Sequence, residues 1–208
     1  IMPVKRRLEL LKYADERHHL VIEDDFENEF VYFQKPTPSL FGLSGGQGVV
    51  YIGSFSRLLL PSIRISFMIL PPELLAAYRK KASFYNQTAS KAEQIALCKF
   101  IRDGHLAAQT RRLKRLYASK LKQLRSAIRQ VFGSVCQIQV GSAGTSLALT
   151  LPCEKNGEEL KKQARVKGLR LQILKETESE VTVLMSCSSM AVQDFVPACE
   201  LLKSIVTA

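Results

Sequence analysis

The sequence lacks the features that several common protein classes require. No apolar run approaches the roughly 20 residues that a membrane-spanning helix needs, and the first residues hold no compact apolar segment of the signal-peptide type. The three histidines do not form a metal site: His18 and His19 are adjacent, and His105 lies far along the chain with no carboxylate or thiol at ligand spacing. No G-x-S-x-G motif lies between a predicted strand and a predicted helix, so a Ser/His/Asp hydrolase is not indicated. We therefore expect neither a membrane partner nor a metal.

Cysteine is present, but not at the spacing of a redox or zinc motif. The five cysteines show no C-x-x-C pattern and three lie among apolar neighbours; they are Cys98, Cys136, Cys153, Cys187 and Cys199. Buried free thiols in a reducing compartment are therefore favoured over disulfides. We accordingly expect a cytoplasmic protein.

The positive charge is large and unevenly distributed. The 208 residues carry a formal net charge of +11, and the second half holds 17 Lys and Arg against 9 Asp and Glu. Much of the excess lies in Thr110–Gln130, which contains Arg111, Arg112, Lys114, Arg115, Lys120, Lys122, Arg125 and Arg129. This segment is either the solvated face of an interdomain helix or a contact for DNA, where added cations gain from counterion release. No side chains suited to reading bases are apparent in it.

Hydrophobic periodicity predicts α/β material followed by an α+β unit. Before residue 104, helices are predicted over 4–17 and from the prolines at 71 and 72 onward, and strands over 19–23, 49–54 and 64–71. Residues 87–131 are predicted to be helical, with a break near Asp103 and Gly104. The later strand candidates are CQIQV, SLALTL, LRLQIL and VTVLMSCS, with helices over 157–168 and 192–206. Two domains are expected, 1–103 and 104–208.

Polar side chains follow two of the predicted buried strands. Asp24 and Asp25 end the first, and the stretch GSFSRLLLPSIR, with Ser54, Ser56 and Arg57, follows the second. Ligands gather at the carboxyl ends of strands in open α/β sheets, so these residues suggest a pocket for an anion. The acidic run EDDFENEF is alternatively a solvated turn. Arg64 is alternatively a surface cation, although its apolar neighbours imply that its charge needs a partner.

Four blocks of the sequence, in order, resemble one family. IMPVKRRLELLKYA, VIEDDFENEF, VVYIGSFSRLLLPSIRISFMILPPELL and FIRDGHLAAQTRRLKRLY are similar to consecutive parts of the aminotransferase-like domain of MocR/GabR-type bacterial transcription regulators. The resemblance covers about residues 1–130 and continues more loosely to the end. It implies an α/β fold: part of the large domain of a pyridoxal-phosphate-dependent transferase of fold type I in 1–103, then a small α+β domain led by a long basic helix in 104–208.

The resemblance also implies roles for matching positions. Asp24 would pair with the pyridine nitrogen of the cofactor and keep it protonated. Arg64 and Ser54 would bind its phosphate, with help from Ser56. The family's Schiff-base lysine falls on Arg57, and the tyrosine that donates to the cofactor's 3-oxygen falls on Phe26.

The last two positions depart from the family pattern. The guanidinium of Arg57 offers no free amine for a covalent bond to the cofactor, and Phe26 has no hydroxyl to donate. The family's arginine for the ligand carboxylate, expected beyond Leu174, has no match either. Natural loss or redirection of the site explains all three departures, whereas an engineered lysine-to-arginine change explains Arg57 alone.

These features together predict an effector-sensing domain without transaminase activity. We expect it to bind pyridoxal 5'-phosphate or a related phosphorylated ligand non-covalently, to respond to a small anionic or amino-acid-like effector, and to form a homodimer. We expect the winged-helix head that contacts DNA, and the first half of the large domain, to lie upstream of Ile1. The alternative is a working pyridoxal-phosphate-dependent aminotransferase, or an engineered variant of one; position 57 discriminates between them.

Overall fold

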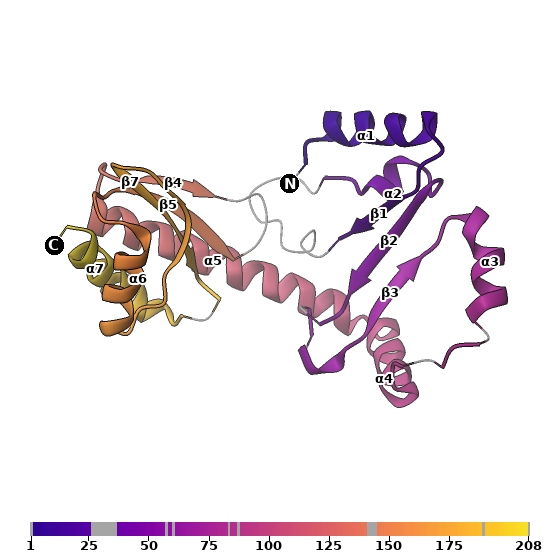
Figure 1. The fold of residues 1–208 in the computed structure, drawn as a ribbon. Helices are drawn as coiled ribbons and strands as arrows, with labels where there is room; N and C mark the ends of the chain where they lie inside the picture. Colours follow the sequence, from indigo (N-terminus) through magenta and orange to yellow (C-terminus); the bar gives the residue numbers. More distant parts are fainter. Residues whose placement is uncertain are drawn as a thin grey trace. The chain divides into compact units, whose positions relative to one another are not determined.

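The computed structural model describes residues 2–25, 37–56, 58–59, 61–82, 84–86, 88–140, 145–188 and 190–207. The chain divides into two compact units, Ile1–Leu113 and Lys114–Ala208 (Figure 1). The division between the two units falls inside a long helix. Of the helices within the described ranges, none combines the length and the apolar character needed to cross a membrane.

The first unit contains a small sheet with helices around it. Its elements are α1 (Val4–Glu16), β1 (Val21–Asp24), α2 (Leu40–Leu43), β2 (Val49–Ser54), the 3-10 turn η2 (Pro61–Ile63), β3 (Ser66–Ile69), α3 (Pro72–Ala82), α4 (Lys91–Arg102) and the beginning of α5 (His105–Phe132). The helices predicted at α1 and α3 and the three strands are confirmed. The predicted helical break is also confirmed, because Gly104 adopts a φ of 77° between α4 and α5.

The three strands are ordered β1-β2-β3, with β2 in the centre. β1 runs parallel to β2, with Val21 opposite Val49, and β3 runs antiparallel to β2, with Ser54 opposite Ser66. These three strands therefore include one parallel and one antiparallel pair. The eleven residues that join β2 to β3 are too few for the usual crossover of a parallel pair.

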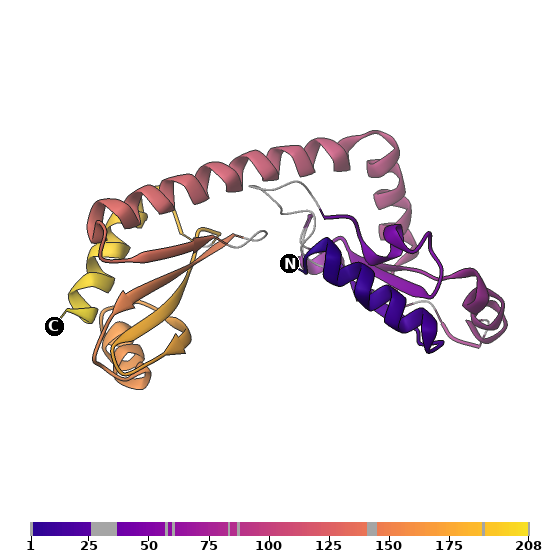
Figure 2. The ribbon, with the colours of Figure 1, turned by 90° about the horizontal axis from the view of Figure 1, so that it is seen from above.

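The second unit is an antiparallel sheet packed against helices (Figure 2). After the rest of α5 come β4 (Gln137–Val140), β5 (Ser146–Pro152), α6 (Gly157–Val166), β6 (Gln172–Glu176), β7 (Glu180–Ser186), the 3-10 turn η3 (Val192–Asp194) and α7 (Phe195–Val206). The strand order is β4-β5-β7-β6 and every pair is antiparallel. All the strands and helices predicted for this region are confirmed to within a few residues.

Alternation along the two central strands builds the core of the second unit. In β5 and β7 every second side chain is buried; these are Leu147, Leu149, Leu151, Val181, Val183 and Met185. The side chains between them are half-exposed, so a single face of the sheet is fully covered. The helices supply the remaining buried side chains, among them Leu121, Leu124 and Ile128 of α5, Leu160 of α6, and Phe195, Leu202 and Ile205 of α7.

Lysine side chains satisfy backbone carbonyl groups at helix ends in this unit. Lys155 Nζ donates to the carbonyl oxygen of Ile205 at 2.8 Å, and Lys203 Nζ donates to that of Val131 at 2.8 Å. Both acceptors lie in the last turn of a helix, where carbonyl groups have no partner within the helix. Two lysines of this unit therefore stabilise the C-terminal ends of α7 and α5.

The cysteines are free thiols in this structure. Cys153, Cys187 and Cys199 are buried, Cys136 is half-buried and Cys98 is exposed. Burial raises the pKa of Cys187 and, more strongly, that of Cys199, to about 11. The thiols of Cys187 and Cys199 are thus held in their neutral form, which does not react as a nucleophile.

Candidate functional site

The carboxyl ends of β1 and β2 place two of the predicted site residues on one face of the sheet. The two strands are parallel and Asp24 lies opposite Ile52 in the register. Since side chains alternate along a strand, Ser54 shares the face of Ile52 and therefore that of Asp24. Asp24 is exposed and Ser54 is half-exposed. A carboxylate and a hydroxyl thus stand accessible at the same edge.

The turn after β2 continues this edge. Ser54 Oγ accepts a hydrogen bond from the backbone N–H of Ser56 at 3.2 Å, so the hydroxyl proton of Ser54 stays available for a ligand. The N–H of Phe55 donates to the carbonyl oxygen of Ile65 at 3.1 Å, which joins the two ends of the loop between β2 and β3. This bond brings the backbone of Arg64 close to the end of β2.

Arg64 has an unusual backbone conformation. Its φ is 48°, in the left-handed region that a residue with a side chain enters at a cost of roughly 1–2 kcal/mol. The side chain is exposed, and among the described residues no carboxylate forms an ion pair with it. The sequence-based expectation that Arg64 pairs with a charge is thus not met by any residue described here. Strained residues cluster at functional sites, and this guanidinium is accessible to an anion.

On the opposite face, Asp25 is engaged by a residue that the sequence analysis did not select. Tyr51 donates its hydroxyl to Asp25 Oδ2 at 2.5 Å, and the N–H of Asp25 donates to the carbonyl oxygen of Ile52 at 3.0 Å. The Tyr51 ring in turn lies beside those of Phe41 and Phe67, with centroids 6.0 and 6.1 Å away. Asp25 is therefore a structural carboxylate, and Asp24 is the one left accessible to a ligand.

A second missed feature lies immediately before Asp24. Glu23 is 8% exposed, and its Oε1 accepts from Arg7 Nη1 at 2.8 Å. The backbone N–H of Leu40 donates to Oε1 at 2.9 Å and that of Phe41 donates to Oε2 at 3.0 Å. Glu23 thus ties β1 to α1 and to the first turn of α2, and fixes the strand end that carries Asp24. Its position directly after the apolar residues Val21 and Ile22 was the available signal.

Two predicted site residues, Phe26 and Arg57, lie outside the described residues. The roles of these two residues therefore remain predictions from the sequence. In the part of the chain that the structure describes, no three His, Cys, Asp or Glu side chains are placed to hold a metal ion.

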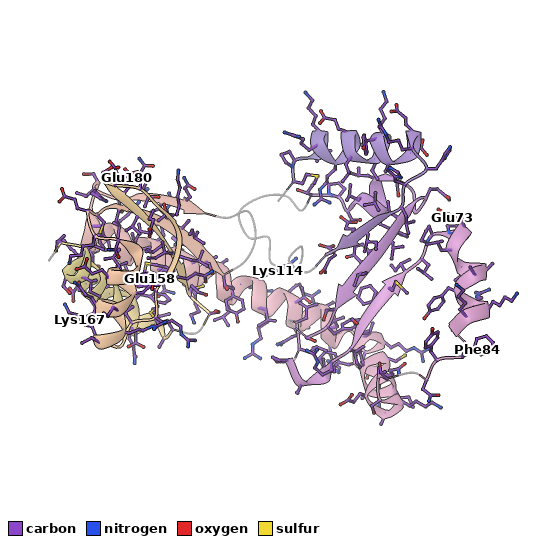
Figure 3. The ribbon with its side chains drawn as sticks, viewed as in Figure 1. Glu73, Phe84, Lys114, Glu158, Lys167 and Glu180 are labelled. Atoms are coloured by element: carbon purple, nitrogen blue, oxygen red, sulfur yellow. The ribbon has the colours of Figure 1, made fainter. Side chains whose placement is uncertain are left out.

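A separate hollow of about 870 Å³ lies at the opposite ends of the same strands. Its lining includes Leu8, His18, Gly48 and Glu73, and the Glu73 carboxylate accepts the N–H of Gly48 at 3.0 Å. Figure 3 shows Glu73 at the start of α3. Since Val21 also lines this hollow, it lies at the amino ends of β1 and β2, away from Asp24 and Ser54.

The accessible donor set fits a phosphorylated ring with a basic nitrogen. A guanidinium and a hydroxyl are suited to a phosphate, and an exposed carboxylate is suited to a protonated pyridine nitrogen. The three groups come from Arg64, Ser54 and Asp24, each at the carboxyl ends of β1 and β2 or in the loop that follows β2. Inorganic phosphate would satisfy the guanidinium of Arg64 and the hydroxyl of Ser54 equally well, but it would leave the carboxylate of Asp24 without a partner.

Comparisons with known proteins point to transcription regulators. No family model matches the chain. It is 37% identical over 171 residues to YdeL, an uncharacterized HTH-type transcriptional regulator of Bacillus subtilis (strain 168), covering 82% of this chain and 37% of YdeL. It is 30% identical over 174 residues to the probable rhizopine catabolism regulatory protein MocR of Rhizobium meliloti, covering 84% of this chain and 35% of MocR.

Aminotransferases are similar as well. The 2-aminoadipate transaminase of Thermus thermophilus is 29% identical over 131 residues, which is 62% of this chain and 33% of that enzyme. Among solved structures, the α-aminoadipate aminotransferase LysN of Thermus thermophilus matches with a TM-score of 0.77 at 22% identity, over 99% of this chain and 54% of LysN. A multiple substrate aminotransferase of Thermococcus profundus matches with a TM-score of 0.80 at 20% identity, over 99% of this chain and 52% of the enzyme.

The shared fold is that of pyridoxal-phosphate-dependent transferases of fold type I. The homologues are thus MocR-type regulators and aminotransferases of this fold. The chain spans well under half the length of the curated relatives it matches and about half of each solved structure.

Proposed function

We propose that this chain is the aminotransferase-like, effector-sensing part of a bacterial MocR-type transcription regulator, and that it does not catalyse transamination. Residues 1–103 would supply part of the large domain and 104–208 the small one. The regulator would act in the cytoplasm and bind DNA through a helix-turn-helix head outside these 208 residues.

The observation that carries this proposal is the residue at position 57. Transamination needs an amine that serves as nucleophile and as proton carrier. The sequence has Arg57 where the family's lysine falls, and a guanidinium, which stays protonated at neutral pH, fills neither role. The regulators among the relatives, at 37% and 30% identity, support the same reading.

The ligand of the site would be pyridoxal 5'-phosphate or a related phosphorylated compound, held without a covalent bond. When bound, such a cofactor supplies an electron-withdrawing ring. In this chain Arg64 and Ser54 would bind the phosphate, with Ser56 and Arg57 beside it, and Asp24 would accept a hydrogen bond from the ring nitrogen and keep that nitrogen protonated. Phe26 would contact the ring without donating a hydrogen bond. A small anionic or amino-acid-like effector would then bind next to the cofactor.

Calorimetric titration with pyridoxal 5'-phosphate and with inorganic phosphate tests the site. Each charge-assisted hydrogen bond is worth about 1.5–3 kcal/mol, so Arg64→Ala should weaken binding roughly ten- to a hundredfold. Arg79→Ala is the matched control, because Arg79 is an exposed cation of the same unit at the end of α3. Equal affinity in the unchanged chain and in Arg64→Ala, or no binding in either, would contradict the proposed site.

The second candidate function is a working pyridoxal-phosphate-dependent enzyme, or an engineered lysine-to-arginine variant of one. The similarity to the 2-aminoadipate transaminase favours it. Borohydride treatment of the chain with pyridoxal 5'-phosphate, followed by peptide mass spectrometry, separates the two. A single stoichiometric lysine adduct that excess inorganic phosphate prevents would support the enzyme and overturn our proposal. Scattered substoichiometric adducts are expected instead.

We further propose that the chain forms a homodimer with its sites near the subunit boundary. All four residues of β3 are exposed, including Phe67, Met68 and Ile69, and Phe84 beyond α3 (Figure 3) is 84% exposed. Apolar surface of this extent is typical of a face that a partner covers. Light scattering at micromolar concentration should give twice the chain mass, and a uniform monomer would contradict the dimer.

A further inference from the structure

The part of α5 in the second unit concentrates positive charge on one exposed face. Arg115, Lys122, Arg125 and Arg129 follow one another at spacings of seven, three and four residues. At 3.6 residues per turn these spacings align the four side chains, over roughly 21 Å of helix. All four are exposed, and we call them the α5 stripe. In Figure 3 the labelled Lys114 marks where the helix enters this unit.

The stripe lies on a different face of α5 from the residues that build the core. Leu121, Leu124 and Ile128 are buried in the unit. Lys120, which is not in the stripe, donates to the carbonyl oxygen of Met190 at 2.7 Å and therefore has a structural role. The α5 stripe contributes nothing comparable to the packing of the unit.

No carboxylate among the described residues neutralises the charge of the stripe. The 28 residues of α5 include no aspartate or glutamate, and within the described part of the chain no stripe residue pairs with a carboxylate. Like charges four residues apart, such as Arg125 and Arg129, destabilise a helix. Ordinary solvated helices relieve this repulsion with acidic residues at the same spacing. The uncompensated charge is consistent with an external polyanion.

A hollow at the end of the stripe is suited to a phosphate group. It has a volume of about 460 Å³ and is lined by Arg125, Arg129, Gly133, Ser134, Cys136 and Ile138. The two guanidinium groups and the hydroxyl of Ser134 are the donor types that bind phosphate oxygens. Burial raises the pKa of the Cys136 thiol although Arg129 acts in the opposite direction, so the thiol adds no negative charge there at neutral pH.

We propose that the α5 stripe binds the phosphate backbone of double-stranded DNA without reading its sequence. DNA presents a phosphate every 3.4 Å or so along each strand, so about six phosphates of one strand span the length of the stripe. The choice of DNA among polyanions rests on the proposed function. An anionic membrane fits less well, because the apolar face of α5 in this unit is buried and cannot insert into lipid. The α5 stripe would thus contact DNA in addition to the contact that the DNA-binding head makes.

Fluorescence anisotropy with a labelled 30-base-pair duplex of arbitrary sequence, titrated with the 208-residue chain, tests the proposal. Four phosphate contacts predict that log K falls against log salt with a slope of about −3 to −4. Neutralising all four cations (Arg115→Gln, Lys122→Gln, Arg125→Gln, Arg129→Gln) should remove most of the binding. Replacing the three arginines with lysine should keep the slope, since the charges remain.

A second quadruple variant is the matched control for net charge. Lys162, Arg165, Arg170 and Lys175 are exposed cations of the same unit outside the stripe, and their change to glutamine removes the same formal charge. This control should retain the salt slope of the unchanged chain within about one unit. An equal loss in both quadruple variants, no binding by the unchanged chain at low salt, or tighter binding to vesicles of anionic phospholipid would each overturn the proposal.

The failure of this inference and that of the proposed function are distinguishable. The stripe variant contains every residue of the cofactor site, so its titration with pyridoxal 5'-phosphate should match that of the unchanged chain. Loss of DNA binding with retained cofactor binding is the expected result. DNA binding by a chain that binds no cofactor would leave the stripe supported and remove the sensing function.

Discussion

Replacing Glu23 with glutamine should destabilise the first unit far more than its single charge suggests. The carboxylate accepts three hydrogen bonds, one from Arg7 and two from the backbone of Leu40 and Phe41. Glutamine has the same shape, but its amide nitrogen cannot accept, so at least one of these donors loses its partner. The Arg7 guanidinium also loses the opposite charge that compensates its burial.

The magnitude follows from the exposure of the pair. The side chains of Arg7 and Glu23 are 15% and 8% exposed, which places them between a surface pair and a fully buried one. Breaking a buried pair by removing one partner costs about 3–5 kcal/mol, and each charge-assisted hydrogen bond contributes about 1.5–3 kcal/mol. We expect Glu23→Gln to lower the free energy of unfolding of this unit by about 2–4 kcal/mol.

Urea denaturation measures the loss in free energy of unfolding. Hydrogen exchange, measured separately on the native protein, reports on the backbone amides around α2. The amides of Leu40 and Phe41 should exchange faster in Glu23→Gln, because their acceptor is weakened or lost. Glu16→Gln is the matched control: its partner Lys12 is 3.8 Å away and the two side chains are 79% and 58% exposed. That change should cost less than about 1 kcal/mol.

A double-mutant cycle supplies the result that would refute this reasoning. If the Arg7–Glu23 pair is responsible, Arg7→Met should cost much less in the Glu23→Gln background than in the unchanged chain. Equal costs in the two backgrounds, or unchanged protection of the Leu40 and Phe41 amides, would show that Glu23 does not act through these partners.

Three further predictions concern the core, the sheet and the thiols. Leu149→Ala should cost about 2–5 kcal/mol in urea denaturation because Leu149 is fully buried, whereas Leu174→Ala, half exposed on β6, should stay within about 0.5 kcal/mol. Gly53→Ala should cost about 1–3 kcal/mol because its Cβ would overlap the Phe67 ring, and Phe67→Leu should restore part of the loss. Burial, with smaller effects of Cys136 and Glu200, raises the pKa of Cys199 from 9.0 to about 11. The folded state therefore keeps the thiol proton to a higher pH than the unfolded state does. The free energy of unfolding should accordingly fall as the pH rises from 9 to 11. This decline should be smaller in Cys199→Ala, and an equal decline in both proteins would contradict the assignment.

The sequence predicts elements well where their signals are local. β2 is a short apolar run at 49–54, and the alternation in β5 directly encodes its buried face. The four-residue helix α2 was not among the predicted elements, because its first turn is held by the carboxylate of Glu23 from β1. The antiparallel direction of β3 was not predicted either, although the short connection from β2 favours it.

The candidate site is predictable in the same uneven way. The shared edge of Asp24 and Ser54 follows from the parallel pairing of two strands whose ends are polar. Which of the adjacent aspartates stays accessible does not follow, since that depends on the Tyr51 hydroxyl reaching Asp25 across the register. The left-handed backbone of Arg64 is likewise invisible in the sequence, because φ depends on the Phe55–Ile65 hydrogen bond and the surrounding turn.

The strand order of the second unit has a consequence for synthesis on the ribosome. β4 and β5 pair across a short connection, with Val140 opposite Leu147, so this hairpin can form as soon as it emerges. The other edge of β5 must wait for β7, whose Ser186 pairs with Ser146 forty residues earlier. Until then, a nascent chain carries an unpaired apolar strand that is prone to aggregation. Translation therefore has to pass β7 and α7 before this unit can close.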